Sequence, residues 1–146
     1  MKKGANRLIQ LKKQGFCCSQ SLLLVGLEDQ GKTNGDLIRA VSGLASGLFR
    51  GEICGALTGG ACMLGLYAGR GTPDDAEDHR LCIMVEELVE WFSQEYGQLF
   101  GGIRCDDILG NDPGACSSCC SLVLGTYAKV RTLLAVNGLD LECSGL

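Results

Sequence analysis

The chain has 146 residues, of which 46% are hydrophobic and 21% charged, and its net charge at pH 7 is −4. This length and composition predict one globular domain spanning residues 1–146 and argue against disorder, and the negative charge argues against a nucleic-acid surface. The N-terminus lacks the apolar segment of a signal peptide, and the longest uncharged run, residues 53–69, is short and rich in glycine. We therefore expect a cytoplasmic protein that is not integral to a membrane.

Helical periodicity runs through the chain, and no segment has the alternating pattern of a strand. In the first half we expect helices at residues 5–13, 17–30, 36–51 and 53–69, separated by glycine-containing turns. The leading helix carries basic residues on a face that we expect to be solvated: Lys2, Lys3, Arg7, Lys12 and Lys13.

In the second half, Thr72-Pro73 has the features of a helix start, and the helix is expected to run to about Tyr96. Its predicted apolar stripe consists of Cys82, Val85, Val89 and Phe92. A single helical turn is expected at residues 105–109, and a last long helix at 113–137. The predicted fold is all-α, a single-domain helical bundle of about five to six helices.

Glycine is abundant for a helical protein, with 22 residues. Gly43 and Gly47, and likewise Gly55 and Gly59, lie four apart within expected helices, which produces smooth faces. One interpretation is close packing between helices. The other is close approach of a cofactor or partner near Cys54, which would make Gly55 and Gly59 cofactor-binding positions. Smooth helix faces also favour a homodimer.

Ten cysteines and one histidine give the chain its chemistry: Cys17, Cys18, Cys54, Cys62, Cys82, Cys105, Cys116, Cys119, Cys120 and Cys143. A reducing cytosol disfavours a framework of stable disulfides, so this number of thiols indicates metal binding or redox chemistry. His79 lies among charged residues and is expected on the surface.

Three cysteines are expected to be bystanders. Cys82 falls on the apolar stripe as a core thiol, and Cys143 lies in the C-terminal tail. Cys62 follows Cys54 by two helical turns, about 12 Å, so the two cannot share a small metal site. The other cysteines fall at the starts of expected elements, where helix N-termini favour the thiolate that both metal binding and disulfide exchange require.

The spacing of these thiols argues against some kinds of site but does not decide between metal binding and thiol–disulfide chemistry. Neighbouring cysteines such as Cys119 and Cys120 are too close to pair with each other readily. Cys116 and Cys119 form a single C-x-x-C outside a thioredoxin-like context, and one such pair disfavours a zinc ribbon. Metal binding and thiol–disulfide chemistry therefore both remain open.

Four segments carry a resemblance to a known family: Gly15-Phe16-Cys17-Cys18-Ser19-Gln20-Ser21, Cys54-Gly55-Ala56-Leu57-Thr58-Gly59-Gly60, Phe100-Gly101-Gly102-Ile103-Arg104-Cys105 and the cysteines preceding Ser121-Leu122-Val123. In this order, over residues 15–135, they resemble the C_GCAxxG_C_C family of putative redox-active proteins. By the family pattern, the key thiols are Cys18, Cys54, Cys105 and one of Cys119 or Cys120. The resemblance implies a small helical, cytoplasmic protein of prokaryotes. A similar domain in split-Soret cytochromes is associated with an iron–sulfur centre, although this chain lacks haem attachment motifs.

The preferred hypothesis is that Cys18, Cys54, Cys105 and Cys119 or Cys120 bind a [2Fe–2S] or [4Fe–4S] cluster for electron transfer or redox sensing, with a redox partner protein yet to be identified. The alternative is a metal-free dithiol–disulfide oxidoreductase that pairs Cys18 or Cys54 with Cys105 or Cys119. A zinc-binding module is a third reading, supported by the type of ligand but not by its spacing.

Overall fold

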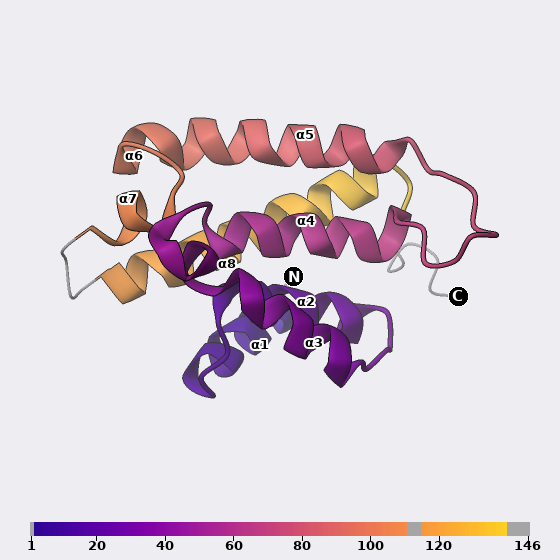
Figure 1. The fold of residues 1–146 in the computed structure, drawn as a ribbon, viewed down its shortest axis with the longest axis horizontal. Helices are drawn as coiled ribbons and strands as arrows, with labels where there is room; N and C mark the ends of the chain where they lie inside the picture. Colours follow the sequence, from indigo (N-terminus) through magenta and orange to yellow (C-terminus); the bar gives the residue numbers. More distant parts are fainter. Residues whose placement is uncertain (1, 111–114, 140–146) are drawn as a thin grey trace.

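The computed structural model describes residues 2–110 and 115–139, with the backbone alone for residues 115–118 (Figure 1). The helices that it contains are α1 (Lys2–Lys13), α2 (Cys18–Asp29), α3 (Gly35–Val41), α4 (Gly55–Ala68), α5 (Arg80–Phe92), α6 (Gln98–Phe100), α7 (Cys105–Leu109) and α8 (Ala115–Val136). Short 3-10 and π-helical turns follow α3 and α5: η1 (Ser42–Leu44), η2 (Gly47–Gly51) and η3 (Ser93–Gly97). The all-α fold is confirmed; α7 corresponds to the single helical turn expected at residues 105–109, and the short α6 was not expected.

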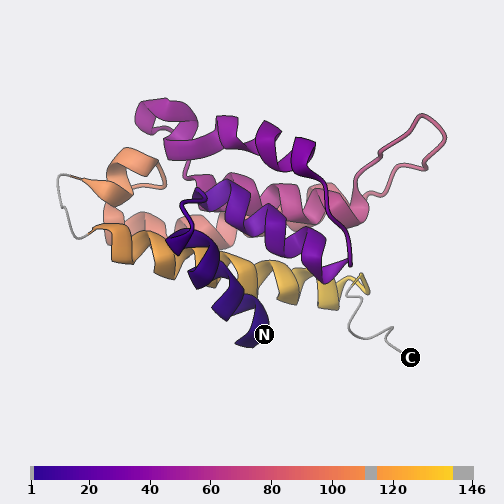
Figure 2. The same ribbon diagram turned by 90° about the horizontal axis from the view of Figure 1, so that it is seen from below.

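The uncharged helix α4 lies at the centre of the bundle, between α2, α5 and α8 (Figures 1 and 2). Its glycines allow close approach of the neighbouring helices. A Cβ atom at Gly59 would lie 2.8 Å from the Cα atom of Ser19, and one at Gly60 would lie 2.7 Å from the Thr126 side chain. Two of the small residues of α4 are thus used for close packing within the molecule.

One hydrophobic core joins α1, α2, α4, α5, α7 and α8. Helix α8 contributes the following buried residues: Leu122, Val123, Tyr127, Val130, Leu133 and Leu134. Within the described part of the chain, Cys119–Val136 is the segment long and apolar enough to cross a membrane, and 44% of it is buried. In this structure, α8 is a core helix.

The third expected helix, at residues 36–51, ends early. Regular α-helix stops at Val41, and the chain turns through left-handed conformations at Ser46 (φ 50°), Leu48 (φ 61°) and Phe49 (φ 56°). Gly47 and Gly51 adopt positive φ in the same turn, which glycine does at little cost. The expectation failed because apolar spacing continues across this segment, whereas the glycines permit a reversal of the backbone.

The helix expected to start at Pro73 begins instead at Arg80. The Asp75 carboxylate accepts hydrogen bonds from the backbone N–H of Gly71 at 2.7 Å and of Thr72 at 3.1 Å. It also accepts one from the Thr72 hydroxyl at 3.0 Å. These bonds stabilise a compact turn, so the segment expected to start a helix forms a loop instead.

The apolar face of α5 also differs from the expected stripe. Met84, Leu88 and Phe92 are fully buried, whereas Val89 is 39% exposed. Cys82 is exposed and donates its thiol hydrogen to the carbonyl of His79 at 3.2 Å. Residues two positions apart in an α-helix are separated by about 200° around the helix axis. Cys82 therefore lies nearly opposite Met84. The expectation of Cys82 as a core thiol was wrong.

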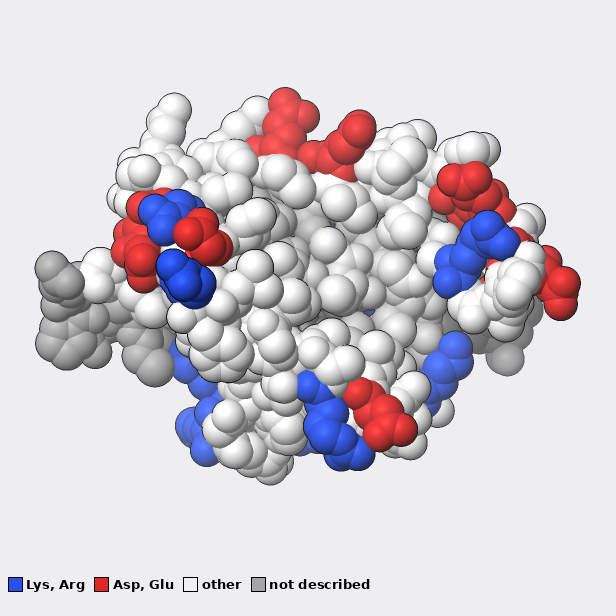
Figure 3. Space-filling view, viewed as in Figure 1, with Lys and Arg blue, Asp and Glu red and all other residues white. Residues whose placement is uncertain are grey.

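Charged side chains on the face seen in Figure 3 gather in separate groups, and the middle of that face is uncharged. The helix at the centre of the bundle, α4, has no charged residue. The homodimer expected from smooth helix faces stays a prediction.

Candidate functional site

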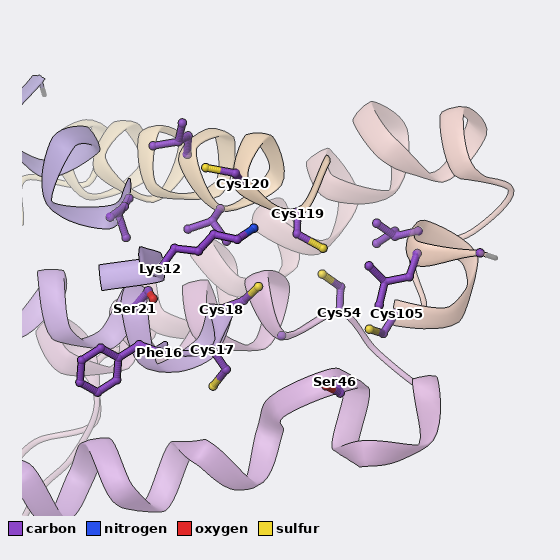
Figure 4. A pocket seen from close by; sticks show the side chains of 17 residues that line it. Lys12, Phe16, Cys17, Cys18, Ser21, Ser46, Cys54, Cys105, Cys119 and Cys120 are labelled. Carbon is purple, nitrogen blue, oxygen red and sulfur yellow. The ribbon is translucent and has the colours of Figure 1, made fainter. Parts of the chain in front are cut away.

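One cavity of about 550 Å³ brings together six cysteines that are widely separated in the sequence: Cys17, Cys18, Cys54, Cys105, Cys119 and Cys120. They come from the N-terminal ends of α2, α4, α7 and α8, as expected for thiols placed at the starts of elements (Figure 4). Cys62 and Cys82 do not line this cavity. Cys116 and Cys143, which were also singled out in the sequence, have side chains outside the described residues.

Cys54 and Cys105 are held at the cavity by a short antiparallel bridge between Ile53 and Arg104. The N–H of Cys54 donates to the carbonyl of Ile103 at 3.2 Å, and the N–H of Cys105 donates to the carbonyl of Glu52 at 2.6 Å. Side chains alternate between the two faces of an extended segment. The two cysteines that flank the bridge therefore share a face, opposite to that of Ile53 and Arg104.

The glycines of the Phe100–Cys105 segment shape this bridge. Gly101 has φ 77° and Gly102 has φ 157°, conformations that favour glycine. A Cβ atom at Gly102 would collide with the Asp107 carboxylate, which accepts a hydrogen bond from the N–H of Arg104 at 3.1 Å. The local sequence thus turns the chain, caps α7 and delivers Cys105 to the cavity.

Cys17 and Cys18, adjacent in sequence, have different surroundings. Cys17 is the N-cap of α2, and its sulfur lies 3.3 Å from both the Ser19 hydroxyl and the Gln20 amide oxygen. Cys18 is the first residue of the helix, and in Figure 4 its sulfur points toward the centre of the cavity while that of Cys17 points away. This arrangement places Cys18 with the other inward-facing thiols.

Cys18 and Cys119 form a hydrogen-bonded thiol pair across the cavity. The Cys18 thiol donates to the Cys119 sulfur, which lowers the pKa of Cys119 to about 6 despite partial burial. The same bond, together with burial, raises the pKa of Cys18 above its ordinary value. The hydrogen bond therefore favours the thiolate form of Cys119 over that of Cys18.

Cys54 and Cys105 are electrostatically linked to this pair. Burial raises the pKa of Cys54 to about 11, against the backbone N–H groups of Ala56 and Leu57, which lower it. The charges of Cys119 and Cys105 make smaller contributions to this raised value. The pKa of Cys105 is raised first by burial and then by the charge of Cys119. Four thiols from four helices thus interact with one another.

Figure 4 distinguishes the neighbouring cysteines of α8. The sulfur of Cys119 points toward those of Cys18 and Cys54, whereas the sulfur of Cys120 points away from them. Of the two candidates in this segment, Cys119 is therefore the one that lies with the inward-facing thiols.

The remaining cavity wall is largely apolar and contains these residues: Leu8, Phe16, Ile108, Leu109, Val123 and Leu124. Gly55 also lines the cavity, whereas Gly59 packs against Ser19 and is not part of the wall. Among the described residues of the wall, the one charged side chain is Lys12, which the sequence had placed on a solvated helix face. The spacing of four residues between the buried Leu8 and Lys12 could have shown that they share a face.

The described metal-binding side chains do not form a site for a single metal ion. Among residues 2–110 and 119–139, no three His, Cys, Asp or Glu side chains are close enough together to hold one. The thiols are gathered around a cavity rather than around one point. This geometry suits a group larger than a single ion, or chemistry between pairs of thiols.

Comparison with known proteins places the chain in a family. The model of the family described as putative redox-active protein (C_GCAxxG_C_C) matches residues 16–133. No curated protein and no solved structure is significantly similar to the chain. The matched region contains the six cysteines of the cavity but not α1.

Proposed function

Because the chain belongs to the C_GCAxxG_C_C family of putative redox-active proteins, we propose that it is a redox protein in which Cys18, Cys54, Cys105 and Cys119 bind an iron–sulfur cluster. The bound cluster would accept and release single electrons, for electron transfer or redox sensing. Family membership supports the redox role, and the arrangement of the thiols supports the choice of cofactor.

The observation that carries this proposal is the convergence of four interacting thiols from four helices on one cavity. In a [4Fe–4S] cluster each thiolate binds a different iron atom, and in a [2Fe–2S] cluster two thiolates bind each iron, so neither cluster requires three protein ligands around one ion. Such a ligand set agrees with the lack of a single-ion site among the described residues. The cavity volume of about 550 Å³ leaves room for the cluster.

The residues around the thiols also suit an iron–sulfur cluster. The backbone N–H groups of Ala56 and Leu57, at the start of α4, lower the pKa of Cys54 and so favour its thiolate. Hydrogen bonds to ligand sulfurs and a largely apolar wall are two means by which a protein tunes a cluster. In this chain the N–H groups come from the start of α4, whereas the apolar wall is formed by Phe16 and by residues of α1, α7 and α8.

The proposal is tested by purifying the protein without oxygen and measuring its visible spectrum together with its iron, zinc and acid-labile sulfide content. Visible absorbance with matching iron and sulfide is the expected result. A colourless protein that takes up neither iron nor sulfide on reconstitution would overturn the proposal. Stoichiometric zinc without sulfide would favour the zinc-binding module.

The hydrogen bond between Cys18 and Cys119 favours a second candidate, a metal-free dithiol–disulfide oxidoreductase. The Cys119 thiolate would attack an organic disulfide and release one thiolate, leaving a mixed disulfide. Cys18, after losing its proton, would then attack the Cys119 sulfur and release the second thiolate. The two cysteines are oxidised to a disulfide and the organic disulfide is reduced to two thiols.

This second candidate is tested on metal-free protein treated with an organic disulfide. Loss of two hydrogens from the protein mass, with a Cys18–Cys119 linkage in the peptide map, is expected. Mixed disulfides that never resolve, or a linkage between other cysteines, would contradict it. The redox partner protein, the cytoplasmic location and the homodimer stay predictions from the sequence.

A further inference from the structure

Helix α1 lies before the region matched by the family model, yet it closes one wall of the cysteine cavity with Leu8 and Lys12. Its position is fixed by packing. Leu8 and Leu11 are almost completely buried, and Arg7 forms an ion pair with Glu28 of α2 at 2.9 Å. Leu11 also accepts a hydrogen bond from the N–H of Phe16 at 3.2 Å.

Because α1 is held in this way, Lys12 has a defined place beside the thiols. Figure 4 shows its ammonium group extending toward the sulfurs of Cys18 and Cys119. The other described side chains of the wall are thiols, hydroxyls and apolar groups, so the charge of Lys12 acts on the sulfurs through a medium less polar than water.

We propose that Lys12 sets the reduction potential of the cysteine site by stabilising its reduced state. Reduction of a cluster adds one electron from an external one-electron donor and no proton is required, so the negative charge of the site grows by one. A fixed positive charge at the cavity wall favours that state and raises the potential. This inference rests on the proposed function, and it assigns a role to a helix outside the matched region.

The test replaces Lys12 by methionine, which keeps an unbranched side chain and removes the charge. The potential is measured by anaerobic optical titration with dithionite as the electron donor. Lys12→Met is expected to favour the oxidised state by about tenfold, which lowers the potential by about 59 mV for a one-electron couple. Lys12→Arg keeps the charge and is expected to restore a potential near that of the wild type.

Lys13→Met is the matched control, because Lys13 is the neighbouring residue of α1, is exposed and does not line the cavity. It removes the same charge from the same helix and is expected to leave the potential nearly unchanged. Equal potentials in wild type and Lys12→Met would overturn the inference, as would equal shifts in Lys12→Met and Lys13→Met. Thermal unfolding of each variant separates a charge effect from loss of α1 packing.

The failure of the inference is distinguishable from that of the proposed function. If the wild type takes up no iron and sulfide, the cluster proposal fails and the Cys18–Cys119 couple is titrated in dithiothreitol buffers. There, two electrons and one proton convert the disulfide to a thiol and a thiolate, and a tenfold effect of Lys12→Met lowers the potential by about 30 mV. An unchanged potential, or the lack of a reversible couple, would contradict the role of Lys12. A cluster that assembles normally and has the same potential in wild type and Lys12→Met would overturn the inference and leave the proposed function standing.

Discussion

Cys54 donates its backbone N–H to the carbonyl of Ile103 at 3.2 Å, a hydrogen bond that joins the Cys54 segment to the Cys105 segment. The reciprocal bond, from Cys105 to Glu52 at 2.6 Å, completes the pair around the Ile53–Arg104 bridge. Two thiols from distant parts of the chain are therefore placed by backbone bonds, independently of any bound group. This prearrangement makes the contribution of each cysteine testable.

Cys54→Ser is expected to abolish stable cluster binding and redox activity, because Cys54 is central among the interacting thiols and only 6% exposed. The backbone bridge does not involve the side chain, so the fold is expected to persist. Iron and sulfide content after reconstitution, with circular dichroism for helicity, measures both effects.

Cys82→Ser is the control for this variant, since Cys82 is exposed and does not line the cavity. It is expected to retain the iron and sulfide of the wild type. A Cys54→Ser protein that binds as much iron as Cys82→Ser and remains redox-active would refute the assignment of this site.

Gly59 and Gly65 form a matched pair within α4. A Cβ at Gly59 would lie 2.8 Å from the Cα of Ser19, whereas one at Gly65 would meet nothing within 4 Å. Gly59→Ala is expected to lower the free energy of unfolding by about 1–3 kcal/mol through overpacking. Gly65→Ala is expected to raise it by about 0.5–1 kcal/mol, because alanine is the better helix former.

Urea unfolding of the metal-free proteins compares these two substitutions directly. If Gly59→Ala proves as stable as Gly65→Ala, then α2 and α4 are not as closely packed as described. The comparison also addresses the role of Gly59, which the sequence had suggested as a cofactor-binding position and which lies at the α2–α4 contact.

In the metal-free protein, alkylation of Cys119 by iodoacetamide is expected to depend on pH with a midpoint of about 6, the pKa to which its hydrogen bond with Cys18 lowers it. Below that pH the protonated thiol reacts slowly with iodoacetamide, and above it the thiolate reacts readily. Cys54, whose pKa burial raises to about 11, is expected to remain nearly unreactive at pH 7. Mass spectrometry of peptides, sampled over time, gives each rate.

Cys18→Ala tests the cause of this shift. Without the Cys18 donor, the pKa of Cys119 is expected to rise toward its ordinary value, so alkylation at pH 7 slows. An unchanged rate in Cys18→Ala would mean that the hydrogen bond does not control Cys119.

The sequence predicted much of the cysteine site because it depends on local signals. Glycines and capping residues mark the starts of helices, and Cys18, Cys54 and Cys105 lie at such starts. The all-α fold followed from the spacing of apolar residues. The backbone bridge between Ile53 and Arg104 could not be predicted, because it joins two segments too short to show an alternating pattern.

Other features depend on tertiary contacts that no local pattern records. Lys12 was expected in solvent, and its place at the cavity follows from how α1 packs through Leu8 and Leu11. Cys82 was expected in the core because Val85 and Phe92 suggested a stripe, whereas the buried face is centred on Met84 and Leu88. A small error in predicting which face of a helix is buried therefore places an exposed residue in the core.

The measurement that tests the central claim most directly is the iron and sulfide content of reconstituted wild type beside Cys119→Ser and Cys120→Ser. These neighbouring cysteines both line the cavity, but the sulfur of Cys119 points toward the other thiols and that of Cys120 points away. A full cluster is expected in wild type and Cys120→Ser, and severe loss in Cys119→Ser. A wild type without iron and sulfide, or equal content in the two variants, would contradict it.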